Sequence, residues 1–175
     1  MADRHDQPQE SLQGQAAVEK IQELADAAKT CMFGSGLNDF PYDFRPMAIQ
    51  SVDDSGVAWF LSASDSKKNR DIALDARVMW TVQNDQEYSY LSIAGQAKVH
   101  TDRATVDRFW TSFADNWFDG KDDPRLTVIA VTPTDGHCWE TKNGKIVSFV
   151  KMAVGAMTGS GSDAGVAAQL EVGAR

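Results

Sequence analysis

One short stretch of the sequence concentrates side chains that can bind an anion. It lies between an apolar run and a segment with helical character, and it contains Ser62, Ser64, Ser66, Lys67 and Lys68. Hydroxyls and lysines donate hydrogen bonds to phosphate oxygens, and N–H groups at a helix N-terminus add partial positive charge. Taken alone, the stretch fits a helix cap with solvated charges at least as well as a phosphate site.

A further basic residue, Arg45, lies at the start of an apolar segment, residues 44–50, which we predict to be a strand. A turn at residues 52–56 leads to another predicted strand at 57–62, so the two strands form a hairpin that brings Arg45 near the serines and lysines. Pro46 indicates an edge or irregular strand, where backbone groups can turn towards a ligand. A surface arginine followed by a strand-starting proline explains the same pattern without a ligand.

Five aromatic residues form a third candidate group: Phe109, Trp110, Trp117, Phe118 and Trp139. Tryptophan-rich surfaces mark interfaces or sites for flat ligands. Core packing is the alternative, and it is the better interpretation for Phe109. Trp110 and Trp117 are harder to bury completely on a short helix and its loop.

Several common functional motifs are missing from the sequence. It contains no GxGxxG, GxxxxGK[ST] or Gly-x-Ser-x-Gly pattern. The acidic residues between Asp115 and Asp123 lack EF-hand spacing and indicate a solvated loop. The histidines are scattered, so we predict no metal site. Cys31 and Cys138 fit no metal spacing and are interpreted as buried thiols.

Composition and charge limit the class of protein. The chain has 175 residues, of which 42% are hydrophobic and 24% charged, so we predict one globular domain. A net charge of −8 and a pI of about 4.8 argue against binding to nucleic acid or an anionic membrane. No run approaches the roughly 20 apolar residues of a membrane span. The N-terminus lacks the apolar segment of a signal peptide, so we expect a cytoplasmic protein.

Hydrophobic periodicity predicts a mostly β (α+β) fold, antiparallel and barrel-like, with short flanking helices. We expect a bulge near Gly95 and a helix N-cap at Asp102. Residues 1–9 are predicted to be flexible, and residues 154–175 to be a Gly/Ala-rich tail. The expected helices are 11–28, 65–75 and 102–113, and the expected strands are 29–37, 44–50, 57–62, 78–82, 88–100, 126–133, 136–141 and 145–150. A tight turn is expected at Asn143-Gly144.

The order of several motifs resembles the FMN-binding split-barrel superfamily of pyridoxamine 5′-phosphate oxidase-like proteins, in particular its general stress protein 26 branch. The motifs are AAKTCMF, Arg45-Pro46-Met47, WFLSASDSKK, SIAGQAKV, and WTSFADNWFDGKDDPRLTVIAVTP followed by CWE. The similarity covers residues 22–152. It implies an antiparallel split β-barrel in residues 10–153 and a homodimer with FMN in two equivalent grooves between the subunits.

The resemblance also implies roles for individual residues. A strand that begins with arginine contacts the flavin ring and ribityl chain, which points to Arg45, Pro46, Met47 and Gln50. The end of the strand before the helix that begins near the two lysines corresponds to Leu61 and Ser62. The phosphate ligands correspond to Lys67 and Lys68, assisted by Ser66, and we call this strand-to-helix connection the basic corner. The second subunit contributes Trp139 and the position of Tyr90, where the family usually has a glutamine. Trp110 and Trp117 are further candidates from the second subunit.

One departure from the family pattern bears on the reaction and not on flavin binding. True pyridoxamine phosphate oxidases carry an Arg-x-His-x-Arg segment, where this chain has residues 145–149, KIVSF. We therefore expect an FMN-binding stress protein and flavin-dependent oxidoreductase of unknown substrate, not a pyridoxamine phosphate oxidase. A non-catalytic carrier of flavin or pyridoxal phosphate is the alternative, and an acidic interaction protein without ligand is a third. No general acid or base is identified.

Overall fold

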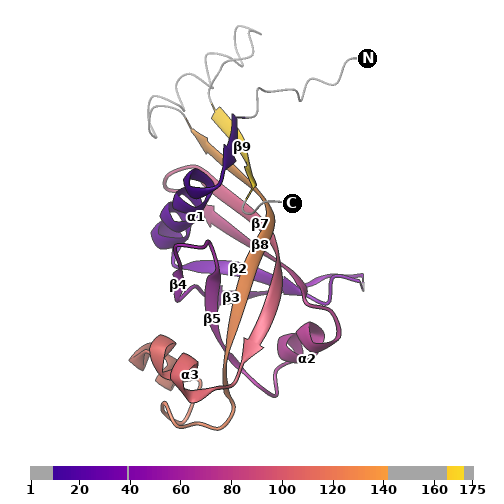
Figure 1. Cartoon of the computed structure of the whole chain (residues 1–175), viewed down its shortest axis with the longest axis vertical. Coiled ribbons are helices and arrows are strands. Elements are labelled where there is room, and N and C mark those ends of the chain that lie inside the picture. Colours follow the sequence, from indigo (N-terminus) through magenta and orange to yellow (C-terminus); the bar gives the residue numbers. More distant parts are fainter. Residues whose placement is uncertain (1–9, 39, 142–164, 172–175) are drawn as a thin grey trace, which may run out of the picture.

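The fold is built on one curled sheet of nine strands, with helices at its margins (Figure 1). The structure is a computed structural model, and it describes residues 10–38, 40–141 and 165–171. The strand order is β1-β9-β8-β7-β6-β2-β3, with β5 paired to β8 and β4 paired to β5. Every described pair is antiparallel except β1 with β9. The mostly β, antiparallel fold with flanking helices is confirmed.

The elements follow one another along the chain as β1 (Glu10–Gln13), α1 (Gln15–Ala28), β2 (Thr30–Ser35), β3 (Asp43–Ala48), β4 (Ser51–Val52), β5 (Ala58–Ala63), α2 (Lys67–Leu74), β6 (Arg77–Asn84), β7 (Ser89–His100), α3 (Arg103–Phe109), the 3-10 helix η1 (Ser112–Asn116), β8 (Leu126–Thr141) and β9 (Gly165–Glu171). None of these helices is long and apolar enough to span a membrane.

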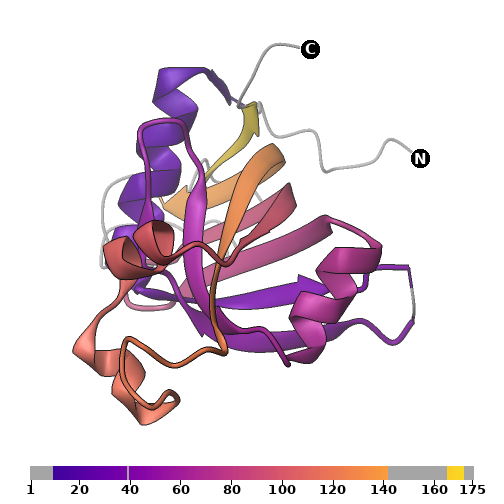
Figure 2. The ribbon, with the colours of Figure 1, turned by 60° about the horizontal axis from the view of Figure 1, so that its bottom comes forward.

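The long strand β8 determines how the sheet curls. Its first half pairs with β5 on one edge and β7 on the other, whereas its second half lies between β7 and β9. The β7–β8 register shifts between Ala94 and Gly95, which confirms the predicted bulge. Figure 2 shows the strands bending around a common interior. The pairing does not continue from β3 to β5, so the described sheet stays split between these two strands.

Aromatic and aliphatic side chains fill the interior of the curl. Phe60 on β5 lies edge-on to Phe33 on β2 and Trp80 on β6, with ring centroids 5.2 and 6.2 Å apart. All three are almost completely buried, and α1 adds Ile21 and Leu24 from one face. A second cluster, built around Val106, Phe109, Leu126 and Val128, holds α3 against β5 and β8. This second cluster fixes the segment that follows α3.

Several sequence-based boundaries are close to those observed. Helix α1 ends at the predicted residue because Lys29 adopts a left-handed backbone with φ 62°. Asp102 caps α3 by accepting a hydrogen bond from the Thr105 N–H, as expected. Cys31 and Cys138 are buried, as predicted, and burial raises the pKa of the Cys31 thiol to about 12.

Other expectations are wrong. The strand that carries Arg45 pairs with β2, and the Ser51–Val52 strand β4 pairs with β5 instead, so the predicted hairpin is limited to its turn. A single strand, β8, replaces the two predicted at 126–133 and 136–141, because its bulged partner β7 stays paired across the break. Trp110 and Thr111 are extended, so the third helix stops at Phe109 and a separate 3-10 turn follows.

The chain ends also differ from expectation. Glu10–Gln13 is a strand instead of the start of a helix, because it pairs with β9. Strand β9 itself lies inside the segment predicted to be a tail without regular structure. The predicted turn at Asn143-Gly144 and the strand at 145–150 lie outside the described residues, as do residues 1–9. The division into terminus, domain and tail stays a prediction.

The bulge at Gly95 leaves no room for a side chain. A Cβ at this position would lie 2.6 Å from the Thr132 carbonyl oxygen and 2.7 Å from Cγ1 of Val131. Gly95→Ala should therefore force β7 and β8 apart and lower the free energy of unfolding by about 1–3 kcal/mol in urea denaturation. Gln96→Ala, at the exposed next position, is the control and should stay within about 0.5 kcal/mol of wild type. Equal stability of the two variants would contradict the close contact.

Candidate functional site

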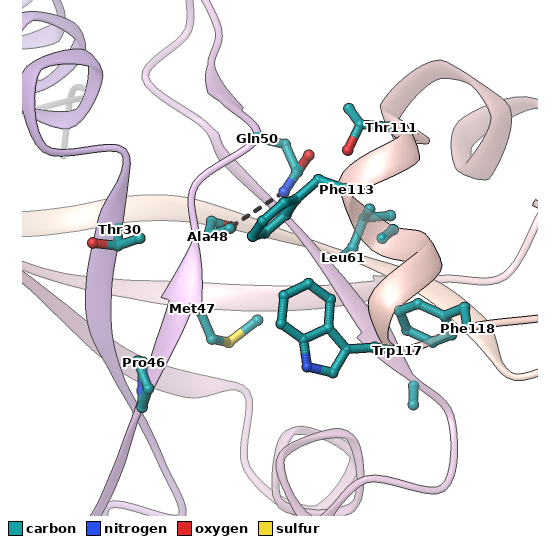
Figure 3. A pocket seen from close by; sticks show the side chains of 12 residues that line it. Thr30, Pro46, Met47, Ala48, Gln50, Leu61, Thr111, Phe113, Trp117 and Phe118 are labelled. Atoms are coloured by element: carbon teal, nitrogen blue, oxygen red, sulfur yellow. Dashed lines mark hydrogen bonds between the residues drawn. The ribbon is translucent and has the colours of Figure 1, made fainter. Parts of the chain in front are cut away.

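A pocket of about 560 Å³ opens at the split between β3 and β5 (Figure 3). Its volume lies in the range of about 300–1,000 Å³ that is usual for small-molecule sites. The lining residues come from three parts of the chain, β2–β3 with the turn that follows, β5, and the segment after α3: Thr30, Pro46, Met47, Ala48, Gln50, Leu61, Ala63, Thr111, Phe113, Ala114, Trp117 and Phe118. None of these side chains is ionisable, so the pocket suits an uncharged, largely apolar group.

The segment after α3 forms an aromatic wall. Phe113 and Trp117 are 60% and 61% exposed, and their ring centroids lie 5.0 Å apart with the planes at 63°. Figure 3 shows Trp117 extending from η1 towards Met47 on β3. Buried Ala114 anchors the turn that carries both rings. Exposed aromatic faces held at fixed positions are suited to packing against a flat ligand.

A charged cluster borders the pocket at the start of β3 and of α2. Arg45 donates a hydrogen bond from Nη1 to Oγ of Ser35 at 2.6 Å, and its Nη2 lies 2.7 Å from a carboxylate oxygen of Asp43. Lys67 Nζ donates to Asp71 at 2.9 Å and lies 3.6 Å from the same Asp43 oxygen. Ser35 in turn donates to Asp71 at 2.8 Å. We call these five residues the ion-pair cluster.

The charges in the cluster stabilise one another. The hydrogen bond and charge of Arg45 lower the pKa of Asp43. Partial burial opposes ionisation of Asp71, but hydrogen bonds from Lys67 and Ser35 outweigh it and lower the pKa of Asp71. The hydrogen bond to Asp71 raises the pKa of Lys67. Asp43, Asp71 and Lys67 are therefore ionised at neutral pH.

Lys68 differs from its neighbour. It is half-buried and makes no hydrogen bond or ion pair with any residue in the described part of the chain. Burial, followed by the charge of Arg45, lowers the pKa of Lys68, and the charge of Asp65 opposes this effect. Its ammonium group is thus available to an external anion.

A buried polar network holds the corner between β5 and α2. Ser62 Oγ donates to Oδ1 of Asn69 at 2.8 Å, and the Asn69 amide donates to Thr127 Oγ1 at 2.9 Å. Thr127 Oγ1 closes the loop by donating to the Ser62 carbonyl at 3.1 Å. Ser66 caps α2 by accepting from the Asn69 N–H at 3.3 Å. Helix capping is therefore confirmed for Ser66, and this network sets where the two lysines begin the helix.

The pocket and the basic residues are continuous along two strands. Arg45 directly precedes Pro46, which lines the pocket, and Ser62 lies between the lining residues Leu61 and Ala63. One end of the split is therefore apolar and aromatic, and the other end carries cations. A molecule with a flat ring and a terminal anion matches both ends.

The structure brings together only part of the residues predicted from sequence. Pro46, Met47, Gln50, Leu61 and Trp117 line the pocket of a single chain. Trp117 therefore does not have to come from a second copy.

The remaining aromatic candidates lie elsewhere. Trp110 does not line the pocket and packs against the second core cluster. Tyr90 and Trp139 are paired neighbours on β7 and β8, and neither lines the pocket. Trp139 is 44% exposed and stacks with His137 at 5.9 Å.

Sequence reasoning missed the polar residues that organise the basic side chains. Ser35, Asp43 and Asp71 hold Arg45 and Lys67 in place, and Asn69 connects three hydroxyl groups. The spacing of Lys67 and Asp71, four residues apart on a helix, was the available signal. Among the described residues, no group of three or more His, Cys, Asp or Glu is placed to hold a metal ion.

The fold and the site together place this protein in the class of split antiparallel β-barrels that have a pocket and basic side chains at the split. The profile of the family described as "Pyridoxamine 5'-phosphate oxidase like" matches residues 16–163. The chain belongs to this family.

Individual relatives agree with the family assignment. General stress protein 26 of Bacillus subtilis is 40% identical over 47 residues, which is 27% of this chain and 34% of that protein. The match therefore spans about a third of this curated relative. A solved structure of a general stress protein 26 from Jannaschia sp. CCS1 is 26% identical, with a TM-score of 0.69 over 90% of this chain and 99% of the other. The general stress FMN/FAD binding protein of Xanthomonas citri is 26% identical, with a TM-score of 0.63 over 74% of this chain and 92% of the other.

Replacing Asn69 should break the hydrogen-bond network between β5, α2 and β8. In Asn69→Ala the Ser62 and Thr127 hydroxyls lose a buried partner, so we expect the free energy of unfolding to fall by about 1–3 kcal/mol. A double-mutant cycle with Ser62→Ala, measured by urea denaturation, isolates the hydrogen bond and should give a coupling of at least about 0.5 kcal/mol. Strictly additive effects would show that the two side chains act independently.

Proposed function

We propose that the chain binds FMN at the split between β3 and β5. The observation that carries the proposal is the continuity between an apolar, aromatic pocket and a corner of basic side chains. FMN combines a flat ring with a terminal phosphate, so it can occupy both ends. Lys68 and Lys67 hold the phosphate, with Ser66 and Ser62 supporting the corner. We assign Arg45 to the phosphate as well, and not to the ring, because Arg45 and Lys67 lie beside the same Asp43 oxygen. Pro46, Met47, Gln50, Leu61 and Trp117 contact the ring and the ribityl chain.

The proposal fits the chemistry of the residues present. Lys68 is a half-buried cation without a hydrogen-bond or ion-pair partner among the described residues, so it can donate to a phosphate. The family relative from Xanthomonas citri is an FMN/FAD binding protein by name. Together these findings favour a flavin phosphate over an apolar ligand without charge.

We further propose that the protein is a flavin-dependent oxidoreductase. A bound flavin supplies the redox chemistry. The chain supplies orientation through the basic corner and shields the ring from water with Phe113 and Trp117. Because the pocket lining has no ionisable side chain, protons come from solvent or from the substrate. Oxidation of pyridoxamine phosphate is not proposed, since residues 145–149 lack the arginines and histidine that this reaction uses in the family.

The proposed assembly is a cytoplasmic homodimer with FMN between the subunits. Strand registers place Tyr90 and Trp139 of each chain on the same sheet face as Met32, which is 42% exposed. An exposed apolar surface of this kind favours association with another protein surface. A second copy can thus place Tyr90 and Trp139 over the flavin, and sedimentation at the monomer mass of 19.1 kDa would contradict this arrangement.

The phosphate assignment is tested with Lys68→Ala. Loss of a hydrogen bond to a charged group costs about 1.5–3 kcal/mol, so FMN affinity should fall by roughly 10-fold to 100-fold in titrations that follow flavin fluorescence. Riboflavin, which has no phosphate, should bind the variant and the wild type equally. Lys98→Ala, an exposed lysine on β7, is the charge-matched control and should leave FMN binding unchanged. Unaltered FMN affinity in Lys68→Ala would refute the assignment.

The redox proposal has its own measurement. Mixing the FMN-loaded protein with NADH or NADPH under anaerobic conditions should bleach the flavin absorbance faster than free FMN at the same concentration. Trp117→Ala, which opens the pocket to water, should slow this reduction relative to Phe40→Ala, an exposed aromatic outside the pocket. A failure of both nicotinamides to reduce the bound flavin would favour the carrier over the enzyme.

A further inference from the structure

The carboxylate of Asp43 occupies the position between two proposed phosphate ligands. One of its oxygens lies 2.7 Å from Nη2 of Arg45 and 3.6 Å from Nζ of Lys67. Both contacts join opposite charges, and the same cations are proposed to bind the phosphate. Asp43 therefore offsets their charges from within the chain.

The two carboxylates of the ion-pair cluster are not equivalent. Asp71 has a side chain that is 15% exposed, and it accepts hydrogen bonds from Ser35 at 2.8 Å and Lys67 at 2.9 Å. Asp43 has a side chain that is 47% exposed, and it lies at the first residue of β3, beside the connection from β2. Asp71 is thus fixed by its surroundings, whereas Asp43 can turn into solvent without breaking the core.

The charge balance depends on where Asp43 lies. Two cations, Arg45 and Lys67, face two carboxylates, Asp43 and Asp71, so the cluster sums to zero. With Asp43 turned away the cluster carries one positive charge, and neighbouring Lys68 adds a second. A phosphate monoester carries about −1.5 to −2 charge at pH 7. The corner therefore matches a phosphate monoester only after Asp43 has left.

We propose that Asp43 is an internal competitor for the phosphate of the ligand, an inference that rests on the proposed flavin site. In the empty protein it pairs with Arg45 and Lys67 and keeps them oriented. When a phosphate monoester enters, its oxygens replace the carboxylate, and Asp43 moves into water. The exchange lowers the net affinity for the phosphate, so the cofactor is held reversibly.

The inference is supported by the cost of leaving Arg45 without a partner. Its side chain is only 21% exposed. An unpaired, partly buried charge is unfavourable, whereas an exchange of one anion for another keeps the charge satisfied in both states. In the pair of Arg45 and Asp43, the arginine is the more buried side chain and the aspartate the more exposed one, so the aspartate is the residue that can leave.

The test compares Asp43→Asn with the wild type. Asparagine keeps the size of the side chain and removes the charge, so FMN should bind roughly threefold to tenfold more tightly. Riboflavin affinity should not change, because riboflavin does not use the corner. Asp54→Asn, in the exposed turn after β4, alters the net charge equally and serves as the control. Asp43→Ala is a second variant, in which the side chain is also too short to reach Arg45.

The possible results separate this inference from the flavin proposal. Tighter FMN binding with unchanged riboflavin binding supports the competitor. Unchanged or weaker FMN binding in both Asp43 variants overturns it, and so does an equal gain for riboflavin. If neither the wild type nor the variants bind FMN, the flavin proposal fails. The role of Asp43 is then tested with inorganic phosphate in place of FMN. Phosphate should then raise the melting temperature of Asp43→Asn more than that of the wild type, and an equal shift overturns the competitor.

Discussion

The missing pairing between β3 and β5 is the constraint on which the rest of the structure depends. Edge strands usually gain a partner or a cover, because their N–H and C=O groups otherwise face solvent. Here β5 pairs with β8 and β4, and β3 pairs with β2, so the two strands present their remaining edges to the same space. The segment around η1 covers that space from one side. A barrel closed by hydrogen bonds between β3 and β5 would have no pocket there.

The split also brings two kinds of chemistry together. Strands β3 and β5 each contribute apolar side chains to the pocket and then lead directly to polar residues. On β3 the change occurs between Pro46 and Arg45, and on β5 it occurs where Ala63 leads into the cap of α2. The few residues between the apolar and polar positions on each strand therefore set the distance between the proposed ring site and the anion site. The aromatic wall needs a separate anchor, which the packing of α3 provides.

Local patterns in the sequence were enough to predict the class of fold, because apolar residues alternate along the segment that forms β7 and because Gly95 marks the bulge. They also located the basic corner. The partners of the strands could not be predicted, since the hairpin rule favours neighbours in sequence and β3 instead pairs with β2. The ion-pair cluster was missed for the same reason. Ser35 and Asp71 are 36 residues apart, and only the pairing of β2 with β3 and the docking of α2 bring them together.

Strands β1 and β9 connect the two ends of the described chain. They pair in parallel, with Glu10 beside Ala168 and Gln13 beside Glu171, and β9 continues onto the edge of β8. The loop that this contact closes contains almost the whole protein, and closing a long loop costs more entropy than closing a short one. Strand β1 pairs with a strand from the far end of the chain, whereas β9 also pairs with β8, the strand that precedes it. Removing β9 would therefore release β1 and uncover the edge of β8, whereas removing β1 would leave β9 paired with β8.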